Sequence, residues 1–292
     1  LLNNHRECIK NEKPLVSKNS AGYSIWNVYN EETDTFDLTQ LFVGSQGTLG
    51  LISEITFDLI ATPNESRMLV MFLRAKHLPK LGEIINMVLK YKPESFESYD
   101  DKTFNVMLKV FPKLFKRLGG NPFKLAKDFW PEIKLVLTGG IPKLVLMAEF
   151  VGDDESKIIN LANTVQHIIG NKYDIPTHVT ATKAEANKFW IIRRESFKLL
   201  RENVHNKHTA PFIDDISVLP EHLPKFLPRL YAILDEYDLL YTVAGHAGDG
   251  NFHIIPLMDL VITKNRDLIF ELADKVYKLV FEFGGSMSAE HN

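Results

Sequence analysis

The sequence has almost no cysteine, and this scarcity excludes two kinds of site. Cys8 is the one cysteine among the 292 residues. A disulfide within the chain requires a second cysteine, and cysteine-rich zinc sites require several thiolates, so neither can form. Such cysteine usage is typical of proteins from reducing compartments, and we expect a cytoplasmic location.

The sequence also lacks long apolar runs and a strong excess of either charge. No run of about 18 apolar residues occurs, so the sequence predicts no membrane-spanning helix. The 34 basic and 37 acidic side chains leave a net charge of -3, which gives no reason to expect a nucleic-acid partner. The content of 45% hydrophobic and 24% charged residues is typical of a globular protein. The length allows one large domain or two of ordinary size.

Apolar periodicity predicts strands and helices on both sides of a boundary near Thr62-Pro63. Residues 52–59 and 68–74 show apolar patterns typical of strands, and the proline interrupts the pattern between them. Further strands are expected at 144–151, 241–244 and 251–256, and helices at 78–90, 154–170, 185–203, 223–237 and 266–283. This succession predicts an α+β fold in which helices cover one face of an open sheet.

Residues 109–134 form a basic segment with interleaved aromatic side chains. Its members include Lys113, Lys116, Arg117, Lys124, Lys127, Phe111, Phe115, Phe123, Phe129 and Trp130. A segment of this composition can lie on an anionic membrane surface, here the inner face of the membrane. The alternative is a solvated helical insertion whose aromatic side chains pack on the domain.

Two histidines flank a glycine-rich loop, in the run Gly245-His246-Ala247-Gly248-Asp249-Gly250-Asn251-Phe252-His253. Glycine allows the backbone to turn sharply, so such a loop can aim both imidazoles at one point. Two neutral imidazoles and a carboxylate make an open site for a divalent metal such as zinc, and Glu290 is the natural third ligand. The alternative is a tight hairpin with two surface histidines.

A second motif follows the predicted end of the last helix, in the run Gly284-Gly285-Ser286-Met287-Ser288-Ala289-Glu290-His291. Small residues after the helix could bring the Glu-His pair into a site. Glu290 would then hold a metal while His291 stays free to move protons. The alternative is an exposed loop with two polar residues.

A third motif is the run Gly44-Ser45-Gln46-Gly47-Thr48-Leu49-Gly50. Its spaced glycines could present backbone N–H groups to a phosphate or to an oxygen on a ring edge. It is not a P-loop, because no Lys-Ser or Lys-Thr pair follows. The alternative is an ordinary turn into a strand.

Together these motifs resemble a known family, the FAD-linked oxidases of the vanillyl-alcohol-oxidase or PCMH type. Residues 42–53 and 18–23 resemble the end of the flavin domain in that family. Residues 245–253 and 288–291 resemble the C-terminal motifs of its D-lactate, glycolate and D-2-hydroxyglutarate dehydrogenases, and residues 190–193 resemble its substrate-arginine helix. The resemblance spans nearly the whole chain, in the family's order.

The resemblance implies a two-part architecture. Residues 1–62 would be the C-terminal end of a PCMH-type FAD-binding domain. Residues 63–292 would be the substrate (cap) domain, an antiparallel sheet covered by helices and truncated at its end. Because no glycine-rich pyrophosphate loop precedes these motifs, we interpret the chain as a fragment that is inactive by itself and does not hold FAD.

The resemblance also assigns roles to individual residues. His246, His253 and Glu290 would bind a divalent metal, zinc in the first place. Arg193 and Asn251 would bind the substrate carboxylate. The residues that would contact FAD are Ser45, Gln46, Gly47, Thr48, Leu49, Gly50 and Ile52.

These roles imply oxidation of a 2-hydroxy acid to the 2-oxo acid. His291 would take the hydroxyl proton while a hydride passes to the flavin. A quinone, a cytochrome or another carrier would then reoxidise the flavin. Members specific for dicarboxylates carry a lysine where this chain has Phe212-Ile213-Asp214-Asp215-Ile216, which favours a D-lactate-like or glycolate-like acid.

Three other interpretations remain open. The chain could be a metal-binding module without redox activity. It could be a metal-dependent hydrolase, which would use the same His-His-Glu site but gives no reason for the segment at 42–53. It could also be a structural subunit of a dehydrogenase complex, in which case His291 would be free to change.

Overall fold

The computed structural model describes residues 3–103, 140–187, 189–191, 193–194 and 208–291. The basic aromatic segment at 109–134 lies outside these residues, as does the second half of the helix expected at 185–203. Among the residues that the structure describes, no helix combines the length and the apolar character needed to cross a bilayer.

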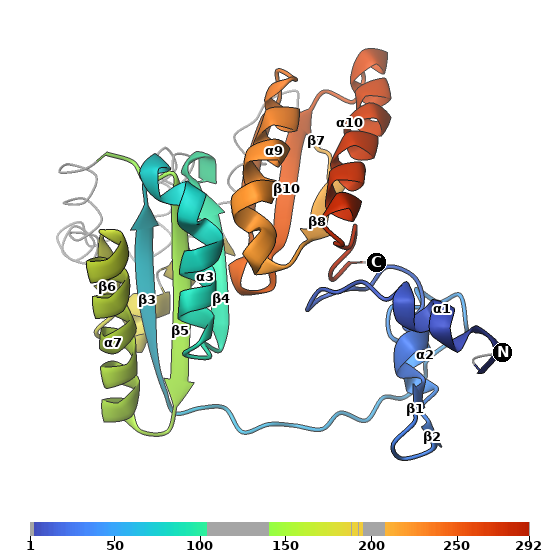
Figure 1. Ribbon diagram of the computed structural model, residues 1–292, viewed down its shortest axis with the longest axis horizontal. Helices are drawn as coiled ribbons and strands as arrows, with labels where there is room; N and C mark the ends of the chain where they lie inside the picture. The colour runs from blue at the N-terminus through green and yellow to red at the C-terminus, as the bar shows by residue number, and fades with distance from the viewer. Residues whose placement is uncertain (1–2, 104–139, 188, 192, 195–207, 292) are drawn as a thin grey trace.

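The main body is an eight-stranded sheet whose neighbouring strands all run antiparallel (Figure 1). From one edge to the other the strands are β6 (Thr177–Val179), β3 (Glu65–Leu73), β5 (Leu144–Gly152), β4 (Ser95–Asp100), β9 (Leu240–His246), β10 (Asn251–Met258) and β7 (His208–Thr209), and β8 (Ile213–Ser217) also pairs with β10. This confirms the predicted α+β class with an antiparallel sheet.

Four helices lie side by side on one face of this sheet (Figure 1). They are α3 (Leu81–Leu89), α7 (Glu155–Tyr173), α9 (Leu223–Asp235) and α10 (Thr263–Glu282). Asp154 is the N-cap residue that begins α7. Its carboxylate accepts hydrogen bonds from the backbone N–H groups of Ser156 and Lys157, which have no partner within the helix. Short 3-10 turns join several elements: η3 (Ala75–Lys80), η4 (Pro220–His222) and η5 (Ala247–Asp249).

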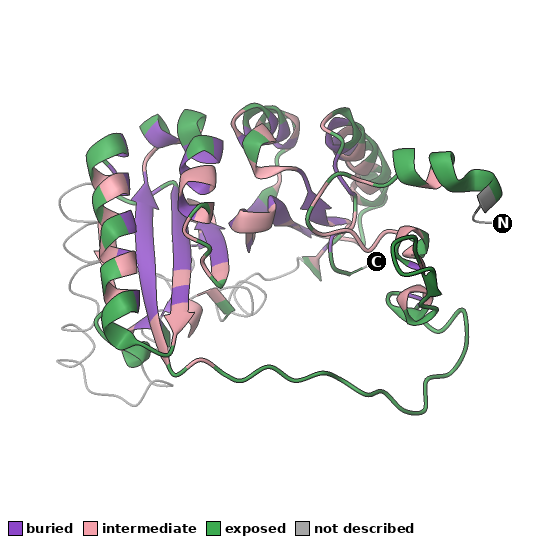
Figure 2. Cartoon of the chain, turned by 60° about the horizontal axis from the view of Figure 1, so that its bottom comes forward, coloured by how far each residue is buried: buried purple, intermediate pink, exposed green. Residues whose placement is uncertain are grey.

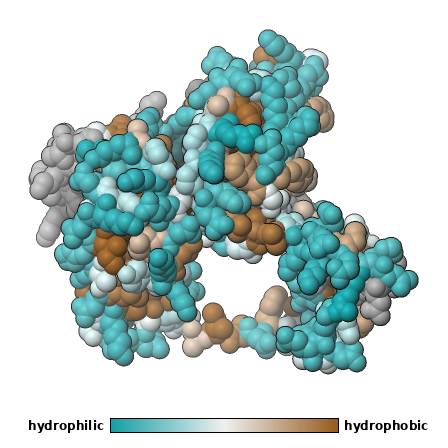
Figure 3. Space-filling view, in the orientation of Figure 1, coloured by the Kyte–Doolittle hydropathy of each residue, from teal (hydrophilic) through white to brown (hydrophobic). Residues whose placement is uncertain are grey.

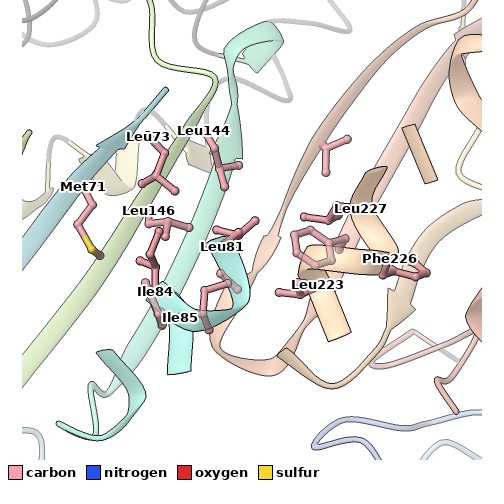
Figure 4. Packing of buried hydrophobic residues seen from close by; sticks show 14 of the residues in the cluster. Met71, Leu73, Leu81, Ile84, Ile85, Leu144, Leu146, Leu223, Phe226 and Leu227 are labelled. Carbon is pink, nitrogen blue, oxygen red and sulfur yellow. The ribbon is translucent and has the colours of Figure 1, made fainter. Parts of the chain in front are cut away.

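The hydrophobic core fills the space between this helical layer and the sheet. Leu73, Leu144 and Leu146 from the strands meet Leu81 and Ile84 of α3 (Figure 4). The cluster continues into α9 through Leu223, Phe226 and Leu227. Burial of each such side chain stabilises the fold by about 1.5–3 kcal/mol, so this side of the sheet is the main source of stability.

The opposite face of the sheet carries a second, smaller cluster. Met68, Val70 and Met147 point to this side because side chains alternate along a strand. They pack against Ala186 and Phe189, which lie in the helical residues 183–187 and 189–191. Helical residues therefore cover part of the second face as well, whereas the sequence predicted cover on one face alone.

Residues 50–63 form an extended linker rather than the strand expected at 52–59. The structure assigns no regular secondary structure there, and the linker is exposed along its length (Figure 2). Leu51 is 100% exposed and Leu59 is 90% exposed, and apolar residues show along it in Figure 3. A strand requires a neighbour for its backbone hydrogen bonds, and none of the described residues pairs with this stretch.

The residues before the linker form a small unit beside the C-terminal end of the chain (Figure 1). Its elements are η1 (Asn3–His5), α1 (Arg6–Asn11), η2 (Ile25–Asn27), β1 (Tyr29–Asn30), β2 (Thr35–Phe36) and α2 (Thr39–Phe42). Most of its side chains are exposed. Its contacts with the sheet domain matter because they bring residues 17–20 to the candidate site described below.

Asp100, the last residue of β4, is a buried carboxylate on the helix-covered side. It accepts hydrogen bonds from the backbone N–H groups of Thr103 (2.8 Å) and Val243 (3.0 Å). Burial nevertheless raises the pKa of Asp100 to about 6. Because the folded-state pKa lies above the unfolded one, this carboxyl group favours folding at low pH and loses that contribution as the pH rises through about 6.

We predict that Asp100→Asn reduces the pH dependence of stability. Between pH 5 and pH 8 the wild-type protein should lose roughly 1.5 kcal/mol of unfolding free energy that the variant does not lose. Urea denaturation at several pH values measures this difference. Asp101→Asn is the matched control, because Asp101 is more exposed and pairs with Lys143 at 2.5 Å. Equal slopes for the wild type and Asp100→Asn would contradict the prediction.

Candidate active site and metal centre

The hairpin of β9 and β10 positions the two histidines of the richest motif. In its register His246 lies opposite Asn251, and His253 lies opposite Ala244. His253 follows Asn251 by two residues, so both imidazoles project from the same face of the sheet. Their ring centroids are 5.4 Å apart. The histidines thus belong to paired strands, and strand register brings them together where the sequence suggested a bent loop.

Gly250 makes the tight turn of this hairpin sterically feasible. Its φ is +60°, in the left-handed region that glycine adopts most readily. A Cβ atom here would lie 1.8 Å from the carbonyl oxygen of Val218. The turn therefore packs directly against the chain that leaves β8, and a side chain at this position would push the two apart.

The carboxylate of Asp215 in β8 places the motif at residues 288–291. One of its oxygens accepts hydrogen bonds from the Ser288 hydroxyl (2.9 Å) and from the backbone N–H groups of Glu290 and His291 (both 2.8 Å). Burial would raise the pKa of Asp215, but these hydrogen bonds hold it below its ordinary value. The chain is thereby held beside the hairpin, and Glu290 is directed towards the histidines.

His246, His253 and Glu290 converge on one point. The Oε2 atom of Glu290 lies 3.3 Å from Nε2 of His246 and 4.0 Å from Nε2 of His253. One ligand atom from each residue lies within 4.8 Å of the other two. Metal–ligand bonds of about 2.0–2.2 Å in a tetrahedral zinc site put ligand atoms roughly 3.3–3.5 Å apart. The donor set therefore fits a divalent metal after a small contraction.

The protonation state of His253 suits a metal ligand. Burial lowers the pKa of its imidazole, with an opposing contribution from a hydrogen bond to the backbone of Asp214. Its Nδ1 atom lies 2.6 Å from the carbonyl oxygen of Asp214. That contact makes Nδ1 the protonated nitrogen, so the lone pair of Nε2 faces Glu290. A neutral, oriented imidazole is the form that binds metals.

Lys18 reaches the same site from the small N-terminal unit. Its Nζ atom lies 2.5 Å from Oε1 of Glu290 and 3.3 Å from Oδ2 of Asp249. Burial would raise the pKa of Glu290, but the hydrogen bond from Lys18 and nearby positive charge hold it below its ordinary value. A backbone hydrogen bond from Ser20 to Ser288 (3.0 Å) strengthens the docking. Residues far apart in sequence thus build one site.

Glu97 completes the surroundings of His246, and sequence reasoning missed it. This residue lies in β4, with its side chain 6% exposed. Its Oε1 atom lies 2.8 Å from Nδ1 of His246, and its Oε2 atom lies 2.6 Å from Nη2 of Arg193. Thus Glu97 links Arg193, predicted to bind substrate, to the group formed by His246, His253 and Glu290. No local motif surrounds Glu97 in the sequence, so only strand pairing reveals its place.

The other two residues with predicted roles are held differently. Asn251 is completely buried, and its side-chain N–H groups donate to Asp215 (3.2 Å) and to the carbonyl oxygen of Ile216 (3.1 Å). His291 is exposed at the surface, and its ring stacks on that of His253 at 5.5 Å between centroids. Asn251 therefore supports the site through its hydrogen bonds to β8, whereas His291 is accessible from solvent.

The glycine-spaced loop lies in the small N-terminal unit. Ser45 is buried, while Gly47, with φ +76°, has open space where a Cβ would stand. The Thr48 hydroxyl lies 2.7 Å from that of Tyr23, which holds the loop against residues 18–23. Leu49 and Ile52 are exposed. The backbone around Gly47 is therefore accessible, and exposed apolar side chains border it.

Comparison with known proteins places this chain in a family. Residues 63–292 match the family described as FAD linked oxidases, C-terminal domain. The chain is 25% identical over 299 residues to D-2-hydroxyglutarate dehydrogenase of Escherichia coli (strain K12), with 98% of this chain and 27% of that protein covered. It is 26% identical over 284 residues to D-lactate dehydrogenase of Anaerostipes hadrus, with 94% and 51% covered.

The fold is also similar to that of solved flavoproteins. The solved structure of p-cresol methylhydroxylase with substrate bound superposes with a TM-score of 0.53 at 10% identity, over 80% of this chain and 47% of that one. The chain spans 27% of the dehydrogenase from Escherichia coli and 51% of that from Anaerostipes hadrus. The resemblance expected from the motifs is confirmed: this chain belongs to the FAD-linked oxidases and carries their C-terminal domain.

Proposed function

We propose that this chain forms the substrate-binding part of an FAD-dependent dehydrogenase that oxidises a small 2-hydroxy acid to the 2-oxo acid. The observation that carries the proposal is the convergence of His246, His253 and Glu290, with His291 and Arg193 beside them. Relatives named as D-lactate and D-2-hydroxyglutarate dehydrogenases support this reaction class. A hydrolase, or a metal module without redox activity, would not explain why the chain belongs to a family of FAD-linked oxidases.

The metal ligands of the proposal are His246, His253 and Glu290, with zinc as the expected ion. When bound, the metal would polarise the substrate's hydroxyl group and FAD would accept its two electrons. The protein's own contribution is to hold the three ligands at the surface of a rigid sheet. Each ligand has a partner that orients it: Glu97 for His246, the Asp214 carbonyl for His253, and Lys18 for Glu290.

His291 is the proposed acceptor of the hydroxyl proton. Its imidazole is exposed to an incoming substrate and adjoins the metal ligand His253. Its Nδ1 atom lies 3.7 Å from a carboxylate oxygen of Asp214. The Asp214 carboxylate can hold the ring in orientation, and an imidazole nitrogen can accept the hydroxyl proton as the substrate is oxidised.

Arg193 is the proposed anchor for the carboxylate of the substrate. A guanidinium group can bind a carboxylate through two parallel hydrogen bonds. Glu97 fixes the orientation of the group, and the arginine side chain remains 17% exposed. The site therefore offers one cation for the acid group and a separate cluster for the hydroxyl group. An electron carrier such as a quinone or a cytochrome is the expected partner for reoxidation of the flavin.

We predict that a monocarboxylate such as D-lactate or glycolate is preferred over a dicarboxylate. This chain has Asp214 and Asp215 in the segment where members specific for dicarboxylates carry a lysine, so the segment supplies negative charge instead of a cation for a second carboxylate. Flavin reduction by D- and L-lactate, glycolate and D-2-hydroxyglutarate measures the preference, followed spectroscopically in the flavin-loaded full-length enzyme of which this chain forms the substrate-binding part. A kcat/KM highest for D-2-hydroxyglutarate, the acid named for the Escherichia coli relative, would reverse this assignment.

We predict that His253→Ala abolishes tight zinc binding. Loss of one of three protein ligands removes a metal–nitrogen bond and opens the site to water, so the dissociation constant should rise at least about 100-fold. Competition with a chromogenic chelator measures the affinity. His167→Ala is the control, because His167 is exposed on α7, which covers the other face of the sheet. Zinc affinity equal to that of the wild type in His253→Ala would remove the metal centre from the proposal.

We predict that His291→Asn slows the chemical step while leaving substrate and zinc binding intact. Asparagine cannot accept the hydroxyl proton, so flavin reduction should slow by about 10²- to 10⁴-fold. Stopped-flow absorbance of the flavin in the flavin-loaded full-length enzyme gives the rate, and KM together with zinc affinity serves as the internal control. An unchanged rate of reduction would favour a structural subunit in which His291 has no chemical role.

A further inference from the structure

We infer that Glu97 is a positioning residue that couples the metal ligand His246 to the substrate anchor Arg193. The inference rests on the proposed function of this site. It adds a residue for which the sequence showed no motif and which acts through its contacts with His246 and Arg193. Its consequence is that metal affinity and substrate binding depend on one shared carboxylate.

The sheet itself places Glu97 beside His246. Strands β4 and β9 pair with Ser98 opposite Gly245 and Tyr99 opposite Ala244. The same register continued by one step puts Glu97 opposite His246, and both side chains then project from the face that carries the metal cluster. The 2.8 Å contact between Oε1 of Glu97 and Nδ1 of His246 agrees with this placement.

The two oxygens of Glu97 serve different partners. One accepts a hydrogen bond from Nδ1 of His246, and the other forms the 2.6 Å ion pair with Arg193. Buried charge is tolerated when it is paired in this way. A protonated Nδ1 leaves the lone pair on Nε2, the atom that lies 3.3 Å from Glu290. Glu97 therefore sets the tautomer of a metal ligand and holds the substrate arginine at the same time.

Glutamine is an informative replacement for Glu97. It has the same shape as glutamate, but it does not have two equivalent acceptor oxygens. A carboxamide has one acceptor oxygen and one NH₂ group, so it can accept from His246 or from Arg193 but not from both. In the remaining contact, the NH₂ group of glutamine faces another hydrogen-bond donor. Either His246 then presents a protonated Nε2 to the metal, or Arg193 moves away from the position in which it meets the substrate.

The test compares Glu97→Gln with Glu149→Gln. Glu149 lies in the neighbouring strand β5, opposite Ser95 of β4, and its side chain projects from the same face as that of Glu97. Glu97→Gln should weaken zinc binding by about 10- to 100-fold, the usual effect of removing a partner that orients a ligand. In the flavin-loaded full-length enzyme at saturating zinc, it should also raise KM for the hydroxy acid more than it lowers kcat. Glu149→Gln should change none of these quantities.

The unfolding free energy separates positioning from a purely structural role. If Glu97→Gln lowers stability but leaves zinc affinity and KM as in the wild type, the inference is wrong. Glu97→Asp keeps the charge and shortens the side chain, so it serves as the second variant if Glu97→Gln does not fold. It should fold, yet still weaken both zinc and substrate binding because both contacts lengthen; wild-type values for both would overturn the inference.

Zinc affinities of His253→Ala and Glu97→Gln together distinguish failure of this inference from failure of the proposed function. If His253→Ala keeps zinc, the metal centre itself is wrong. If His253→Ala loses zinc while Glu97→Gln retains wild-type zinc affinity and KM, the metal centre stands and only the role of Glu97 fails.

Discussion

The antiparallel pairing of β9 with β10 is the constraint on which the candidate site depends. A hairpin fixes which residues share a face, because a shift of one residue would turn every side chain to the opposite side. In the observed register His246 and His253 project from the same face of the sheet. Phe252 and Ile254, which flank His253 in the strand, face the helical layer and belong to the core. Core packing therefore locks the register, and the register holds the two imidazoles together.

The sheet separates stability from chemistry by its two faces. The face under α3, α7, α9 and α10 holds the large hydrophobic cluster. The other face holds a smaller cluster near β3 and β5, and the ionisable side chains of the site near β9 and β10. Strand β4 contributes to both: Phe96 packs in the core, whereas Glu97 meets His246. Alternation along one short strand thus joins the core to the site.

The site is assembled from four distant parts of the chain. Lys18 comes from the N-terminal unit, Glu97 from the middle of the sheet, His246 from the hairpin and Glu290 from the C-terminal segment. Lys18 compensates for the partial burial of the Glu290 carboxylate, and Arg193 compensates for that of Glu97. Because Lys18 belongs to the unit that also carries the glycine-spaced loop, the proposed metal ligand Glu290 is directly connected to the part expected to meet the flavin.

Local sequence was sufficient for several features. The periodicity of residues 154–170 and 266–283 determined two helices, since apolar residues at helical spacing bury one face whatever lies beneath them. The motifs at 245–253 and 288–291 determined which side chains could carry chemistry. Tertiary structure decided the rest. Glu97 lies in a strand rich in polar residues, and the linker at 50–63 has a strand-like pattern but no strand to pair with. Both outcomes depend on partners supplied by distant parts of the chain, and a local pattern holds no information about which backbone or side chain will stand opposite.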